Sequence, residues 1–256
     1  MTDIEKFRQL HHRDEILHIG NVWDVNSALV FESKNYKALG TSSLAIANSL
    51  GYEDGEELSF DELFLIVKQI ISKVNTLVSV DIEGGYSRDV NKIVENIQRL
   101  SEIGVVGINI EDSIVENKQR VILDKEKFSN ILKEIRALLD KKNIDIFINV
   151  RIDCFILGLQ NPLEQTLERL DLYKDCGVDG IFIPTVEKIE HIIEIQKATS
   201  LPINVMCMPE LPSIKKLEDL GIKRVSQGPF IYNKLINTFE NKLDEIEEDS
   251  NYKSLF

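Results

Sequence analysis

The sequence has few of the residues that stabilise small secreted folds or bind zinc. It contains three cysteines, Cys154, Cys176 and Cys207, which lie far apart and show no metal-ligand spacing. The HxH and HExxH patterns of zinc sites are absent. These absences argue against a disulfide framework and a zinc site, and they favour reduced cysteines in a cytoplasmic protein.

Long apolar runs and an excess of positive charge are absent as well. No stretch of eighteen apolar residues occurs, so we expect no membrane span, and the charged start MTDIEKFRQLHHRDE lacks the apolar core of a signal peptide. Acidic residues outnumber lysine and arginine by 43 to 30, which gives a formal net charge of -13. This charge argues against nucleic acid or an anionic membrane as a partner.

Short β-branched runs alternate with longer amphipathic segments along the chain. We expect strands at Leu17–Val22, Ala38–Ser42, Leu77–Asp81, Val105–Glu111, Ile144–Arg151, Gly180–Ile183, Ile203–Cys207 and Arg224–Gln227. The segments between them carry helix signals, such as Ser59 with Glu62 three residues later, or Gly104 after the pattern that starts at Asp89. Strict alternation implies right-handed crossovers and a parallel sheet, and eight units predict a closed (β/α)₈ TIM barrel.

An open, doubly wound sheet is the alternative fold, and it would usually place a glycine-rich phosphate loop after its first strand. The chain reads NVWDVNSA there, without GxGxxG, which favours the barrel. We expect one domain over residues 1–256, a last helix at Ile231–Glu247, and a frayed tail over residues 248–256.

Carboxylates gather at the ends of the predicted strands, where TIM barrels hold their active sites. Asp81 and Glu83 lie two residues apart, so an extended chain projects them to one side. Glu111 ends the next strand, Arg151 ends the fifth, and Asp54 lies in the loop after the second. Clustered carboxylates repel one another unless a cation neutralises them, and oxygen-only ligands suit Mg²⁺ or Mn²⁺.

Several of these residues also have a purely structural interpretation. For Asp112 and Asp153, a role as helix cap or turn former is as compatible with the sequence as a role in the site. Asp54 could equally be a turn residue. Trp23 could line the barrel mouth or belong to the core, and Asn204 is a polar contact candidate in strand seven. A buried arginine without a partner is costly, so we expect Arg151 to pair with a carboxylate of protein or substrate.

Four motifs, LGYEDG, VDIEGGYS, NIEDS and NVRIDCF, occur in an order and spacing that resemble the isocitrate lyase/phosphoenolpyruvate mutase family. The resemblance extends from about Phe7 to Leu235. It implies a Mg²⁺- or Mn²⁺-dependent enzyme that acts on a small 2-oxo carboxylate through an enolate, cleaving or rearranging a C–C or C–P bond. It also implies a homodimer or homotetramer in which the eighth helix, here Ile231–Glu247, is swapped between subunits.

The resemblance also implies roles for individual residues. The metal residues would be Asp81 as direct ligand, with Asp54, Glu83 and Glu111 holding metal-bound waters. Backbone groups of Ser42, Ser43 and Leu44 would hold the substrate carboxylate, next to Asp81, Trp23 and Asn204. Arg151 would contact carboxylate or enolate oxygens, and Arg151 and Asp54 are the catalytic candidates.

The sequence departs from the family in the segment after Glu111. The lyase branch carries a K-[KR]-CGH motif on a mobile lid, whereas DSIVENKQRVILDKEKF has no cysteine, histidine or glycine. This argues against isocitrate or methylisocitrate lyase activity. We expect Asn117 and Lys118 in a solvated loop, and Pro184 stands where the mutase branch has a histidine. Two alternatives stay open: a metal-dependent pyruvate aldolase of another barrel family, and a non-catalytic 2-oxo acid binding protein.

Overall fold

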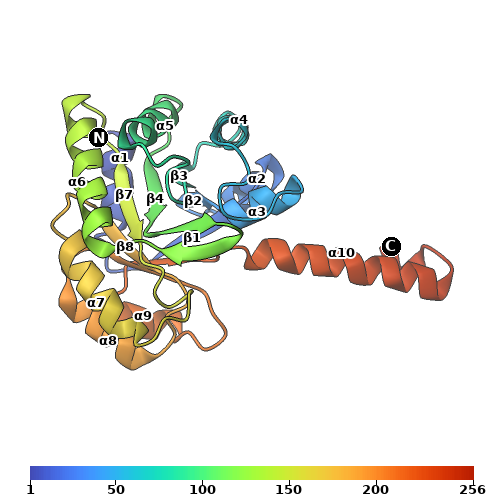
Figure 1. Ribbon diagram of the computed structural model, residues 1–256. Coiled ribbons are helices and arrows are strands. Elements are labelled where there is room, and N and C mark those ends of the chain that lie inside the picture. The colour runs from blue at the N-terminus through green and yellow to red at the C-terminus, as the bar shows by residue number, and fades with distance from the viewer.

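The computed structural model describes residues 1–256 and contains a closed parallel barrel, which confirms the predicted TIM fold (Figure 1). Its strands are β1 Leu17–Val22, β2 Ala38–Thr41, β3 Leu77–Asp81, β4 Gly107–Glu111, β7 Phe147–Arg151, β8 Gly180–Ile183, β9 Ile203–Met206 and β10 Arg224–Ser226. The carboxyl ends of β3, β4 and β7 are adjacent, because β4 pairs with both neighbours and Glu111 lies opposite Arg151.

Helices surround the barrel (Figure 1). They are α1 Asp3–Leu10, α2 Val25–Ser33, α3 Ser43–Ser49, α4 Phe60–Ile71, α5 Val90–Glu102, α6 Lys125–Lys141, α7 Pro162–Tyr173, α8 Ile189–Ala198, α9 Ile214–Asp219 and α10 Phe230–Asp249. The predicted capping box is present, since Ser59 Oγ accepts from Glu62 N at 3.3 Å and the Glu62 carboxylate accepts from Ser59 N. A core of 44 buried residues fills the space between strands and helices, which explains why the strands are apolar on both faces.

Two segments differ from the sequence prediction. The stretch after Glu111 forms an antiparallel hairpin, β5 Ser113–Glu116 and β6 Gln119–Ile122, whose exposed turn residues Asn117 and Lys118 both have positive φ. The solvated position of these two residues is as predicted, but the hairpin itself was missed. The tail over residues 248–256, which we expected to be frayed, contains regular structure in part. Helix α10 continues to Asp249, and a 3₁₀ turn follows at Lys253–Leu255. At its start, Asn251 Oδ1 accepts a hydrogen bond from Lys253 N (2.8 Å).

The last helix, α10, projects away from the barrel (Figure 1). None of its 20 residues is buried, although Leu235 and Phe239 are large and apolar and are 54% and 61% exposed. No helix of the chain is both long enough and apolar enough to cross a membrane.

Helix α1 closes the amino-terminal end of the barrel with aromatic contacts. The His11 ring stacks on Phe147 at a centroid distance of 4.3 Å, and its Nδ1 lies 2.8 Å from the Phe7 carbonyl oxygen. Burial, together with the positive charge of Arg224, lowers the pKa of His11 to about 3. The His11 ring is therefore neutral in the folded protein at pH values well above 3.

This buried imidazole predicts a specific acid sensitivity. The unfolded chain takes up a proton at His11 below about pH 6.5, whereas the folded chain does not until about pH 3. Unfolding free energy should therefore fall by up to about 1.4 kcal/mol per pH unit through this residue as pH drops from 6 to 4. Urea unfolding over that range should show a shallower pH dependence in His11→Asn, which cannot titrate; an equal dependence would contradict the assignment.

Candidate active site

A cavity of about 250 Å³ lies at the carboxyl-terminal mouth of the barrel. Six predicted site residues line it: Ser42, Ser43, Leu44, Asp54, Asp81 and Arg151. They come from the ends of β2, β3 and β7, from the first residues of α3 and from the loop that follows α3. The remaining wall includes polar residues that the sequence analysis did not single out as site residues, among them Asn21, Thr41, Asn109, Thr185 and Ser226.

Asp81 and Glu83 form a carboxylate pair that no cation contacts within hydrogen-bonding distance. The Asp81 oxygens accept from Ser43 Oγ and from Glu83 N, each at 3.2 Å, and Glu83 Oε1 accepts from the Tyr86 hydroxyl at 3.1 Å. Glu83 Oε2 is buried without a partner. Burial, followed by repulsion from Asp54 and Asp81, raises the pKa of Glu83 to about 8, and burial also raises the pKa of Asp81. Added positive charge would stabilise both carboxylates.

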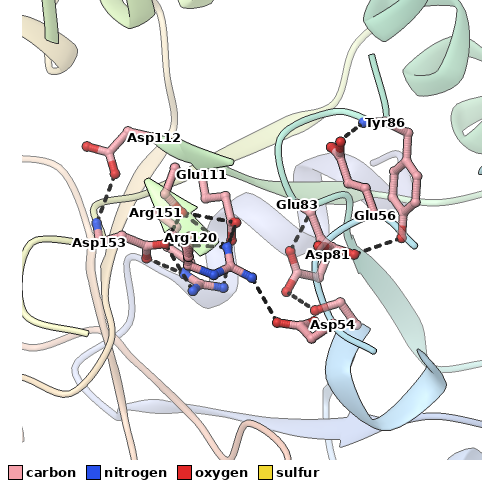
Figure 2. Close-up of polar contacts among 12 residues, drawn as sticks. Asp54, Glu56, Asp81, Glu83, Tyr86, Glu111, Asp112, Arg120, Arg151 and Asp153 are labelled. Carbon is pink, nitrogen blue, oxygen red and sulfur yellow. Dashed lines mark hydrogen bonds and ion pairs between the residues drawn. The ribbon is translucent and has the colours of Figure 1, made fainter. Parts of the chain in front are cut away.

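Arg151 pairs with two buried carboxylates, as expected for a buried guanidinium. Its Nη1 lies 2.7 Å from Glu111 Oε2, and its Nε donates to Asp153 Oδ1 at 2.5 Å (Figure 2). Burial alone would lower the pKa of Arg151, but Asp153 and Glu111 outweigh burial and raise it. Arg151 is therefore a fixed positive charge in the cavity wall.

A second guanidinium, Arg120 of β6, was missed by the sequence analysis. Its Nη2 donates to Asp54 Oδ2 at 2.8 Å, and its Nη1 donates to Glu111 Oε1 and, at 3.1 Å, to Ser113 Oγ (Figure 2). Asp54 is thus an ion-pair partner and not merely a turn residue. The sequence QRVI carries no alternation of polar and apolar residues that would have placed Arg120 on an inner face. The structure places it there, as a less exposed residue between exposed Gln119 and Val121.

Asp112 and Asp153 are fully buried, and neither caps a helix, since the N-caps of α6 and α7 are Asp124 and Asn161. Asp112 accepts from Asp153 N (2.9 Å), from Arg169 Nη1 (3.0 Å) and from the Tyr173 hydroxyl (3.1 Å). Burial and the neighbouring Asp153 raise the pKa of Asp112 to about 6. This network ties α7 to the backbone of Asp153, which in turn holds Arg151.

Trp23, Glu83, Glu111 and Asn204 do not line the cavity. The Trp23 ring meets Tyr232 of α10 edge to face at a centroid distance of 5.2 Å. Asn204 lies beneath the cavity, where its Nδ2 donates to Ser226 Oγ (3.2 Å) and its Oδ1 accepts from Asn149 (3.3 Å). A buried layer of amide side chains therefore forms the support of the cavity floor.

The donor set fits a hard divalent cation that keeps part of its water shell. No three His, Cys, Asp or Glu side chains are placed to chelate one ion together. The carboxylates around the mouth nevertheless offer only oxygen donors, and Glu83 Oε2 and Asp54 Oδ1 are buried without a partner. One direct carboxylate ligand with water-mediated contacts is an arrangement that Mg²⁺ tolerates well.

The chain matches the family model described as phosphoenolpyruvate phosphomutase over residues 7–247. An uncharacterized protein of Mycobacterium tuberculosis (strain ATCC 25618 / H37Rv) is 31% identical over 227 residues, which cover 89% of this chain and 83% of the relative. A candidate phosphonomutase from Burkholderia cenocepacia J2315 shares 30% identity and superimposes with a TM-score of 0.87 over 94% of this chain and 99% of that chain. The chain therefore belongs to the phosphoenolpyruvate phosphomutase family. It also shares the fold of a 2,3-dimethylmalate lyase described as a PEP mutase/isocitrate lyase superfamily member, with a TM-score of 0.85 at 19% identity over 99% of this chain and 90% of that chain.

Relatives with assigned activities carry out more than one reaction. A 2-methylisocitrate lyase of Aeropyrum pernix is 25% identical over 254 residues, which cover 97% of this chain and 81% of the relative. A phosphonopyruvate hydrolase crystallised with oxalate and Mg²⁺ has the same fold, with a TM-score of 0.85 at 17% identity over 99% of this chain and 89% of that chain. These findings confirm the predicted enzyme class, and the alternative of an aldolase from another barrel family is wrong.

Proposed function

We propose that the chain is a Mg²⁺- or Mn²⁺-dependent enzyme that acts on a small 2-oxo carboxylate through an enolate, cleaving or rearranging a C–C or C–P bond. One observation carries this proposal: a single cavity is lined by Asp54, Asp81, Arg151 and the chain from Ser42 to Leu44. Its volume of about 250 Å³ suits a small acid. The hydrolase relative's complex with oxalate and Mg²⁺ supports the same ligand class.

Each residue has a role in this proposal. Asp81 would hold the cation directly, with Asp54, Glu83 and Glu111 fixing its waters. When bound, the cation would supply positive charge beside the substrate oxygens, where negative charge develops.

Arg151 would orient the same oxygens, because Asp153 and Glu111 hold its guanidinium in place. The amides of Ser43 and Leu44 open α3 and have no acceptor within that helix, so they are free to bind the substrate carboxylate.

The decisive experiment is thermal unfolding with Mg²⁺ and a panel of acids: pyruvate, oxaloacetate, 2-oxoglutarate, oxalate and phosphonopyruvate. A ligand that binds only the folded state raises the melting temperature. A rise that requires both Mg²⁺ and one of the acids supports the proposal, and turnover assays on the best ligand then identify the reaction. If no combination shifts the melting temperature, the proposed substrate class and metal dependence are incorrect.

Arg151→Lys should weaken binding of the best acid by about tenfold or more while the protein stays folded. Lysine keeps the charge, but it loses the planar fork that meets Glu111, Asp153 and a ligand at once. Titration calorimetry in the presence of Mg²⁺ measures this loss, which corresponds to about 1.4 kcal/mol or more. Equal affinity in the variant would remove Arg151 from the substrate site.

We also propose a homodimer or homotetramer that exchanges α10 between subunits. The support is the apolar stripe of Ile231, Leu235, Phe239 and Leu243, which are between 41% and 61% exposed. None of the residues of α10 is buried, and the helix meets its own barrel near its start, where Tyr232 contacts Trp23. The three cysteines are free, which fits the proposed cytoplasmic location.

A further inference from the structure

Arg120 separates the mouth carboxylates into two groups. Asp54 and Glu111 each give an oxygen to the Arg120 guanidinium, whereas Asp81 and Glu83 receive only hydroxyl and amide donors (Figure 2). Both oxygens of Glu111 lie next to an arginine, since Oε1 accepts from Arg120 and Oε2 lies 2.7 Å from Arg151 Nη1. Two of the four proposed metal residues are therefore already neutralised by a group of the chain itself.

The β5–β6 hairpin, which carries Arg120, packs against Gly55 and Gly84 in the loops of the site. A Cβ placed on Gly55 would lie 2.3 Å from Val115 Cγ2, and one on Gly84 would lie 3.1 Å from Ile114 Cγ2. The hairpin thus packs closely against the loop that holds Asp54. With 17% of its side chain exposed, Arg120 spans the junction between hairpin and mouth.

Carboxyl groups outnumber guanidiniums at the mouth in this arrangement. The group comprises five carboxylates, those of Asp54, Asp81, Glu83, Glu111 and Asp153, against the guanidiniums of Arg120 and Arg151. Arg120 and a divalent cation would draw on the same two carboxylates, those of Asp54 and Glu111. Two cations that share ligands repel each other as well, so each should weaken the other's hold.

We propose that Arg120 is an exchangeable internal cation, which neutralises Asp54 and Glu111 in the metal-free protein and leaves them when the divalent cation binds. The proposal rests on the metal dependence argued above. Because Arg120 lies on β6, its release removes the ion pairs that fasten the hairpin to the Asp54 loop. Metal binding and the position of the hairpin are then thermodynamically coupled, and the coupling acts equally in both directions.

The test compares Mn²⁺ affinity in the wild type, Arg120→Gln and Arg88→Gln, with free Mn²⁺ counted by electron paramagnetic resonance. Arg88 is the matched control, because it is a nearby arginine that pairs with Glu56 (2.9 Å) and not with a proposed metal residue. We expect Arg120→Gln to bind Mn²⁺ about tenfold more tightly than the wild type, within the usual range of coupling between sites. Arg88→Gln should stay within about twofold of the wild type, because the Arg88 side chain is 49% exposed and its charge is screened by solvent and salt.

Hydrogen exchange of the amides of residues 113–122 in the wild type gives a second readout that needs no variant. These amides should exchange faster when Mn²⁺ is bound. Equal or weaker Mn²⁺ binding by Arg120→Gln, or hairpin exchange that Mn²⁺ leaves unchanged or slows, would overturn the exchange of cations. Failure of the metal dependence itself looks different, because then neither the wild type nor Arg120→Gln would bind Mn²⁺, and both proposals would fall.

Discussion

Asp81→Ala is expected to abolish metal-dependent binding of 2-oxo acids, a loss of more than about a hundredfold in affinity. Removing even an outer-shell partner of a metal costs roughly ten- to a hundredfold, and Asp81 is the proposed direct ligand. The same change should leave the ligand-free protein as stable as the wild type or more so, because burial raises the pKa of this carboxylate and makes its charge unfavourable. Thermal unfolding with and without Mg²⁺ and acid measures both effects.

The opposite signs of these two effects separate a lost ligand from a damaged fold. Glu116→Ala is the matched control, because it removes an exposed carboxylate from the tip of the nearby hairpin and should leave ligand binding unchanged. If Asp81→Ala still showed the full metal- and acid-dependent shift, Asp81 would not be the metal ligand.

Arg169→Met is expected to lower the free energy of unfolding by about 3–5 kcal/mol, the usual cost of leaving one partner of a buried pair uncompensated. Arg169 Nη1 donates to Asp112 Oδ2 at 3.0 Å and its Nη2 donates to the Leu123 carbonyl at 2.9 Å, all within a region that excludes water. Methionine keeps much of the volume but leaves the Asp112 carboxylate without its cation. Denaturant unfolding at neutral pH measures the loss.

A double variant provides the control for this prediction. Asp112→Asn combined with Arg169→Met removes both charges, so it should recover a substantial part of the stability that Arg169→Met loses. The amide can still accept from Asp153 N, the contact that Asp112 makes at 2.9 Å. If the double variant were no more stable than Arg169→Met alone, the loss would come from packing and not from the buried charge.

The barrel could be predicted because each of its strands carries a local signal. Continuous apolar runs such as Gly180–Ile183 are fully buried, and caps such as Ser59 mark where helices begin. The carboxylates at the mouth could be predicted for a related reason, since a residue that ends a parallel strand must reach the same rim. Starts of strands were less accurate: β4 begins at Gly107 and not at Val105, although the backbone of Val106 still donates to Val78 O and accepts from Phe147 N.

The buried networks could not be predicted, because their contacts join residues far apart in the chain. The hairpin is local, but each of its strands has only four residues and carries little signal of its own. Arg120 meets Asp54 across 66 positions, and Asp112 meets Tyr173 across 61. Nothing local distinguishes Asp112 from a capping residue, since the carboxylate can satisfy either a helix amide or a distant guanidinium. The same holds for Asn204, whose partners Asn149 and Ser226 come from other strands.

The exposed position of α10 has a consequence for how the protein is made. A 20-residue helix is about 30 Å long, and most of the stability of a helix in a protein comes from packing of its apolar face. If α10 is exchanged between subunits as proposed, Leu235 and Phe239 become covered only when two chains meet. Refolding should then end in a phase whose rate rises with protein concentration.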